Sequence, residues 1–175
     1  MTAEAGRGPA VSGKPPKPGE TMLTSDPALA KGDAHLVFIG RVHSAWTRAA
    51  PRPRNPREAR ERGGAASLEI DPPFRPGLAG LEAYSHVVVL AWLHEARRDP
   101  IVIQPPHADS PRGVFALRSP VRPNPIGLTV ARILRVDAAN GIIELDAIDF
   151  LDGTPLVDVK PYRPGIDAVP DAVVG

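Results

Sequence analysis

Ten residues from Arg118 to Gly127 combine two arginines and one asparagine with three closely spaced prolines. Each proline fixes its own φ near about −65° and moves the preceding residue out of the helical region, so we predict a stiff, extended loop. Guanidinium groups on such a loop lose little conformational entropy on binding, so Arg118 and Arg122 suit an anionic ligand. An ordinary proline-rich connector between two strands has the same composition, and both interpretations stay open at this point.

A second stretch, residues 48–62, contains six arginines and two glutamates. It is the only concentrated basic stretch in a chain whose net charge is +1, so attraction to a polyanion must be local. Its three prolines predict an extended conformation that spreads the guanidinium groups along a path. Such a cluster suits phosphate contacts with RNA, and a solvated loop is the alternative. The arginines expected to contact phosphates are Arg48, Arg52 and Arg57.

The string from Arg118 to Gly127 resembles the signature of the TrmO/YaeB-like (TsaA-like) family, whose members are S-adenosylmethionine-dependent tRNA methyltransferases. The stretches Gly40–Trp46, Gly80–His86 and Asp158–Tyr162 also resemble family segments, and the similarity extends roughly from Leu36 to Ala172. The resemblance implies methylation of N6 in N6-threonylcarbamoyladenosine, the nucleoside on the 3′ side of the anticodon of tRNA. It also implies that the protein is a homodimer.

The same resemblance implies a set of residues that line the S-adenosylmethionine pocket. Asn55 replaces the glutamine of a family Pro-Arg-Gln triplet, and Glu95 replaces the glutamine of a His-Gln pair. The turn Leu151–Pro155, whose residue types are common in any turn, closes over the cofactor in the family. The implied cofactor-binding residues are Pro53, Arg54, Asn55, His94, Glu95, Arg118, Leu128, Leu151, Asp152, Gly153 and Thr154.

The implied reaction needs a base rather than a metal. A sulfonium methyl group is already activated, and the carbamoyl group of the acceptor makes the N6 proton easier to remove, so a carboxylate suits the task. The candidate catalytic residues are Asp152 and Asp149, followed by Asp158 and Lys160. Arg122 and Lys160 also suit a phosphate or the threonyl carboxylate. If residues 48–62 are only a solvated loop, the RNA surface is expected around Arg122, Lys160 and Arg163.

The rest of the chain predicts an all-β protein. Short apolar runs separated by Gly/Pro turns, with no clear amphipathic helix, indicate a barrel or a sandwich, and the resemblance selects a single-sheeted β-barrel with long proline-rich loops. Among the expected strands are Leu36–Ile39, Gly113–Leu117 and a hairpin that turns at Asp137–Gly141. Residues 1–33 are expected to form a disordered or loosely attached arm, and residues 34–175 the barrel domain.

Composition excludes several classes of protein. There are no cysteines, which excludes disulfides and zinc–thiolate sites, and no residue spacing indicates another metal site. No run of 18 apolar residues predicts a membrane span, and the N-terminal residues do not resemble a secretory signal. We therefore expect a cytoplasmic protein without a metal. Two alternatives stay open, a non-catalytic β-barrel that binds RNA or a ligand, and a methyltransferase with a different acceptor.

Overall fold

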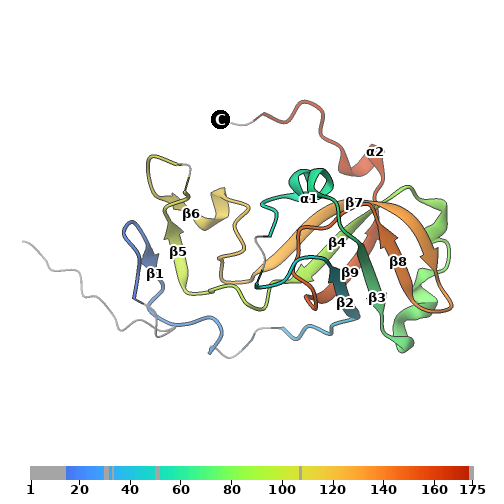
Figure 1. Cartoon of the computed structure of the whole chain (residues 1–175). Coiled ribbons are helices and arrows are strands. Elements are labelled where there is room, and N and C mark those ends of the chain that lie inside the picture. The colour runs from blue at the N-terminus through green and yellow to red at the C-terminus, as the bar shows by residue number, and fades with distance from the viewer. Residues whose placement is uncertain (1–14, 30–31, 33, 50–51, 107, 174–175) are drawn as a thin grey trace, which may run out of the picture. The chain divides into compact units, whose positions relative to one another are not determined.

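The computed structural model describes residues 15–29, 32, 34–49, 52–106 and 108–173 (Figure 1). The chain divides into two compact units. The barrel unit consists of the described residues of 36–92 and 127–175, and the loop unit consists of those of 1–35 and 93–126. No helix within the described residues is long and apolar enough to cross a membrane.

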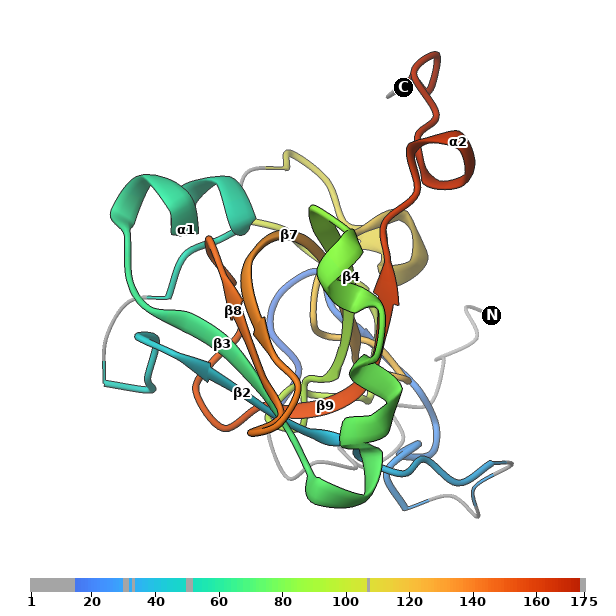
Figure 2. The ribbon, with the colours of Figure 1, turned by 90° about the vertical axis from the view of Figure 1, so that its right-hand side faces the viewer.

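Six antiparallel strands close the barrel in the order β2-β3-β8-β7-β4-β9, and they surround a common centre in Figure 2. Their bounds are β2 (Gly40–Ser44), β3 (Ala66–Ile70), β4 (His86–Trp92), β7 (Ile126–Asp137), β8 (Ile142–Leu145) and β9 (Pro155–Pro161). Helix α1 (Pro56–Arg62), the 3₁₀ segments η1 (Pro72–Leu78) and η2 (Leu81–Ala83), and helix α2 (Pro164–Asp167) complete this unit. The predicted all-β barrel is confirmed, and a second, smaller sheet accompanies it.

Alternation along the strands explains how the barrel fills its interior. On β4, Val87, Val89 and Ala91 are fully buried, while the residues between them are only partly buried. On β7 the buried positions carry small side chains, among them Thr129 and Ala131. Valine side chains from β4 and smaller side chains from β7 thus fill the interior of the closed sheet.

The hairpin between β7 and β8 forms as its turn residues predict. The side chain of Asp137 accepts hydrogen bonds from the backbone N–H of Asn140 at 3.1 Å and from its side-chain Nδ2 at 3.0 Å. Gly141 has a φ of +74°, and a Cβ there would lie 2.6 Å from the carbonyl oxygen of Ile70. Glycine is therefore required at this position both by its backbone conformation and by the close approach of the neighbouring strand.

Two expected strands are not formed. The run Leu36–Ile39 precedes β2 instead of forming a buried strand, and Val37 is 66% exposed. Strand β2 begins at Gly40, where a Cβ would overlap the carbonyl oxygen of Glu69. The expected strand over Gly113–Leu117 is replaced by a short strand that ends at Gly113 and a 3₁₀ turn, η3, that begins at Val114.

The loop unit contains a small sheet of three strands in the order β1-β5-β6. Strand β1 (Thr21–Met22) pairs with β5 (Pro100–Ile103), which pairs with β6 (Arg112–Gly113), and η3 (Val114–Ala116) follows. Part of the segment expected to be a loose arm is thus paired with residues some eighty positions later in the chain. Residues 1–14 lie outside the described residues, and the domain boundary after residue 33 stays a prediction.

Candidate active site

The turn at residues 151–154 is bonded to β2 and to the residues that follow it. The N–H of Asp152 donates to the carbonyl of Trp46 at 2.8 Å, and the N–H of Gly153 donates to Val42 at 2.9 Å. Thr154 is buried, and its hydroxyl donates to the carbonyl of Leu151 at 2.7 Å. This hydroxyl therefore holds the turn in shape, whereas the carboxylate of Asp152 stays about half exposed.

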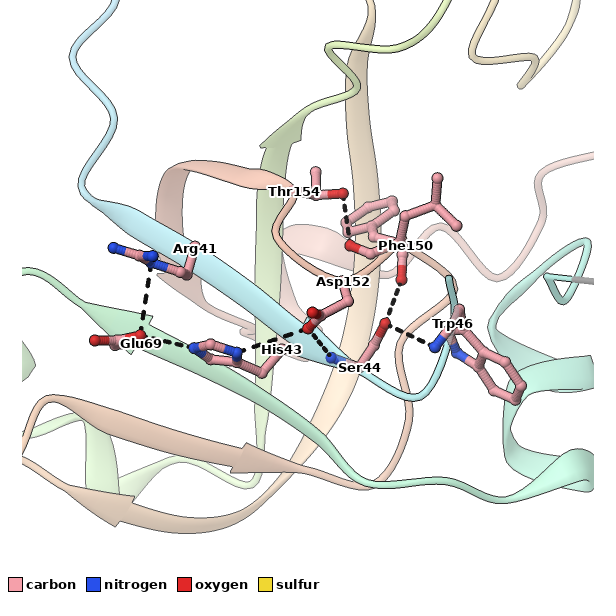
Figure 3. A network of polar contacts seen from close by, with 9 residues as sticks. Arg41, His43, Ser44, Trp46, Glu69, Phe150, Asp152 and Thr154 are labelled. Atoms are coloured by element: carbon pink, nitrogen blue, oxygen red, sulfur yellow. Dashed lines mark hydrogen bonds and ion pairs between the residues drawn. The ribbon is translucent and has the colours of Figure 1, made fainter. Parts of the chain in front are cut away.

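The carboxylate of Asp152 belongs to a polar network on the outer face of β2 and β3 (Figure 3). Its Oδ1 accepts the N–H of Ser44 at 3.1 Å and lies 3.6 Å from Nδ1 of His43. The other ring nitrogen of His43, Nε2, lies 2.7 Å from Oε2 of Glu69, and Nε of Arg41 lies 3.6 Å from the same oxygen. The hydrogen bond with His43, helped by the charge of Arg41, lowers the pKa of Glu69 below its usual value.

Sequence reasoning did not select His43 as a site residue. Arg41 and His43 are two residues apart on β2, so they share a face, and the pairing of Arg41 with Glu69 places a carboxylate opposite them. The alternation of β2 is visible in the sequence, but the register between β2 and β3 is not. The partner of His43 could therefore be found only from the structure.

A buried tryptophan anchors the chain between this network and helix α1. Trp46 is 8% exposed, and its Nε1 donates to the carbonyl of Ile148 at 2.6 Å. Its ring packs with Ala59 of α1, Ala147 and Leu151. Because Leu151 begins the turn, the same cluster fixes both the turn and the helix that follows the predicted cofactor triplet.

That triplet lies at the start of α1. Asn55 is the N-cap of the helix, where its Oδ1 accepts the N–H of Glu58 at 2.9 Å. The N–H of Arg54 donates to the carboxylate of Glu58 at 2.9 Å, and this hydrogen bond lowers the pKa of Glu58. The amide oxygen of Asn55 therefore serves the helix, and its contact with a cofactor stays a prediction, as does that of the buried Pro53.

The predicted extended conformation of the basic stretch is wrong for residues 56–62, which form α1. Pro56 occupies the first turn of the helix, where its missing N–H costs nothing, and Asn55 caps it. Arg57 pairs with Glu61 at 2.9 Å, and Arg60 pairs with Asp146 at 2.6 Å. The exposed arginines predicted to contact RNA remain predictions; they are Arg48, Arg52 and Arg57.

The other candidate bases have different surroundings. Nζ of Lys160 lies 2.6 Å from Oδ2 of Asp158, and this contact raises the pKa of Lys160, which therefore stays protonated at neutral pH and is poorly suited to act as a base. One carboxylate oxygen of Asp149 is buried.

Arg163, expected on the alternative RNA surface, contacts a tyrosine. It donates from Nη2 to the hydroxyl of Tyr84 at 2.8 Å, and its guanidinium lies over the Tyr84 ring.

In the loop unit, one of the loop's own arginines, Arg122, holds the proline-rich loop in shape. Nη2 of Arg122 donates to the carbonyls of Val114 at 2.9 Å and Leu117 at 3.2 Å, so this guanidinium fixes the loop itself. The N–H of Leu93 donates to the carbonyl of Pro125 at 2.8 Å, which attaches the segment before His94 to the same loop.

Four further predicted cofactor residues lie outside the 151–154 turn and the triplet at α1. His94 and Glu95 are exposed at the end of the chain segment that leaves β4, with Nε2 and Oε1 separated by 3.7 Å. Arg118 is exposed in the loop unit, and Leu128 is 48% exposed on β7. Within the described part of the chain, no group of three or more His, Asp or Glu side chains is placed to hold a metal ion.

Comparison with known proteins identifies the family. The family model described as the tRNA-methyltransferase O N-terminal domain matches residues 41–168. The chain belongs to this family. The match contains β2, α1, the 151–154 turn and the loop at 118–127, so the candidate site lies within the family domain.

Individual relatives agree with the family match. The chain is 42% identical over 145 residues to the "Probable S-adenosyl-L-methionine-binding protein VirR" of Rhizobium radiobacter, covering 81% of this chain and 80% of the relative. It is 40% identical over 114 residues to an S-adenosyl-L-methionine-binding protein of Archaeoglobus fulgidus, covering 65% of this chain and 81% of the relative. The crystal structure of TrmO from Pseudomonas aeruginosa matches with a TM-score of 0.66 and 37% identity, over 84% of this chain and 62% of that chain. This chain therefore spans about three fifths of that protein.

Proposed function

We propose that this protein is an S-adenosylmethionine-dependent methyltransferase that modifies tRNA at N6 of N6-threonylcarbamoyladenosine. The observation that carries the proposal is the turn at 151–154, which lies within the family match and presents an exposed carboxylate bonded to β2. The names of the relatives support the cofactor, and the description of the family supports tRNA as the acceptor. The family resemblance implies a homodimer, and we include this in the proposal.

The predicted cofactor residues offer the chemistry that S-adenosylmethionine requires. Gly153 has a φ of +75°, and a Cβ there would meet nothing within 4 Å, so the turn leaves room for a ligand against its backbone. Arg54 and Arg118 are exposed cations suited to a carboxylate. When bound, S-adenosylmethionine supplies an electrophilic methyl group on sulfur.

Asp152 is the proposed base. Asp152 would accept the N6 proton of the acceptor during methyl transfer, and the N–H of Ser44 holds its carboxylate in position. His43 lies beside this carboxylate, because its Nδ1 is 3.6 Å from Oδ1 of Asp152 and Glu69 holds its other nitrogen. Alignment of N6 with the methyl group, rather than a metal, supplies most of the remaining acceleration.

The test combines calorimetry with methyl transfer from labelled S-adenosylmethionine. We expect the protein to bind the cofactor equally well with and without a chelator, and to methylate tRNA only when it carries the threonylcarbamoyl group. Asp152→Asn should bind the cofactor but lower the transfer rate by roughly 10²- to 10⁴-fold, the usual contribution of a general base. Asp109→Asn, at an exposed carboxylate of the loop unit, is the matched control and should retain the rate.

Each part of the proposal has its own contradicting result. Absence of cofactor binding would exclude the methyltransferase. Equal transfer to unmodified tRNA would leave the methyltransferase but exclude the stated acceptor, and an unchanged rate for Asp152→Asn would exclude only this base.

A further inference from the structure

Phe115 is the most exposed aromatic side chain among the described residues. It lies in η3 of the loop unit and is 79% exposed, whereas the next most exposed, Phe38, is 41% exposed. Its neighbour Val114 is fully buried, so the turn directs one apolar side chain inward and presents the next one to solvent.

The segment that carries Phe115 is firmly mounted. Directly before it, Arg112 and Gly113 form β6, which pairs with β5, and η3 itself packs against β5. The two hydrogen bonds from Arg122 to the carbonyls on either side of Phe115 close the turn from the other direction. An aromatic ring on a fixed turn loses little conformational entropy when a ligand stacks on it.

The segment that carries Phe115 is positively charged. Residues 110–126 of the loop unit contain no Asp or Glu, and Arg112 and Arg118 lie exposed on either side of η3. A surface that binds another protein usually contains a continuous apolar patch. Here a single exposed aromatic ring is flanked by arginines instead. An aromatic ring flanked by guanidinium groups is the combination that binds single-stranded nucleic acid, with a base on the ring and phosphates at the cations.

We propose that Phe115 is a stacking platform for an unpaired nucleobase of the RNA, and that Arg112 contacts a neighbouring phosphate. This inference rests on the proposed tRNA acceptor and adds where on the chain that RNA is bound. It requires a single-stranded region, such as the anticodon loop, because a paired base cannot present its face to a side chain. The cofactor has no part in this contact.

The experiment compares two RNAs with the same number of phosphates, an anticodon stem–loop and a fully paired duplex, by fluorescence anisotropy with the full chain. Phe115→Ala should weaken stem–loop binding by about 5- to 100-fold, the range expected for loss of one stacked base, and leave duplex binding within about 2-fold. Phe115→Trp should restore stem–loop binding. Arg112→Gln should weaken both RNAs and make the slope of log affinity against log salt shallower by about one unit.

The matched control is Leu134→Ala, because Leu134 is 58% exposed on β7 between two arginines. It should leave stem–loop binding unchanged. Equal stem–loop affinities for Phe115→Ala and the wild type would overturn the inference, as would an equal loss with the duplex. If Phe115→Ala lost cofactor binding, Phe115 would be assigned to the cofactor site instead. If sedimentation showed a changed oligomeric state, Phe115 would be assigned to the contact with a second copy of the chain. Phe115-dependent binding without any methyl transfer would contradict only the proposed reaction.

Discussion

Replacement of Arg97 by methionine should open the small sheet of the loop unit while leaving the barrel folded. Nη1 of Arg97 lies 3.0 Å from Oε2 of Glu20, and its Nε lies 3.3 Å from Oδ1 of Asp99. The Asp99 side chain is fully buried, and only 10% of the Glu20 side chain is exposed. Burial lowers the pKa of Arg97, but the hydrogen bonds with the two carboxylates outweigh this effect and raise it overall.

The magnitude follows from what the substitution leaves behind. Methionine fills part of the space but leaves Asp99 buried without the Arg97 cation, and breaking a buried ion pair from one side costs about 3–5 kcal/mol. The strands of this sheet contain only two to four residues each, so the local stability available to absorb such a loss is small. The sheet should therefore open locally before the barrel unfolds.

Hydrogen exchange measures this directly, because the N–H of Leu23 donates to the carbonyl of Asp99 at 2.8 Å. A loss of about 3–5 kcal/mol should accelerate exchange of this amide by roughly 100- to 4000-fold, up to the rate of an unprotected amide, which is reached once the sheet is open. The amide of Val42, which donates to Thr154 in the barrel, should be unaffected. Arg112→Met, at an exposed arginine of the same unit, is the control. Unchanged exchange at Leu23, or equal acceleration at Val42, would refute the reasoning.

Two further predictions follow from surface charges. Lys160 has a raised pKa because of Asp158, so its contribution to stability is fully present below its usual pKa of 10.5 and is lost as the pH rises through the higher folded value. Urea unfolding of wild type and Asp158→Asn should thus differ by a constant amount at neutral pH and converge as the pH rises above 10.5. A constant difference throughout would contradict this. Separately, replacing three arginines by glutamine should weaken tRNA binding and leave S-adenosylmethionine binding unchanged. The slope of log affinity for tRNA against log salt should become shallower by about two to three units. An unchanged slope would mean that this stretch is only a solvated loop. These arginines are Arg48, Arg52 and Arg57.

The barrel could be predicted because its signals are local. The apolar run of β4 and the Asn-Gly turn before β8 are both visible within a few residues of sequence. The predicted strand at Leu36–Ile39 is wrong, because an apolar composition does not determine which residues pair with a neighbouring strand. Gly40, which admits the neighbouring Glu69 carbonyl, begins the strand instead.

The ionic contacts within each unit could not be predicted, because each joins residues far apart in sequence. Arg97 meets Glu20 and His43 meets Glu69 only after the strands have adopted their register. Helix α1 differs, because its signal is local. Asn55 before a proline, with Glu58 three positions later, is a helix-start pattern, whereas the prediction of an extended chain rested on the neighbouring prolines alone.

The arginines of residues 48–62 are less available to RNA in the structure than their number in the sequence indicates. In the sequence, the stretch 48–62 carries a net charge of +4 from six arginines and two glutamates, which favours it as the phosphate-binding segment. In the structure, three of those arginines contact carboxylates, including that of Asp146 outside the stretch, so their field is partly neutralised. Residues 110–126 of the loop unit include Arg112, Arg118 and Arg122 but no acidic residue, and they carry an exposed ring as well. A polyanion with unpaired bases thus finds charge and stacking together around Phe115, whereas α1 offers only charge.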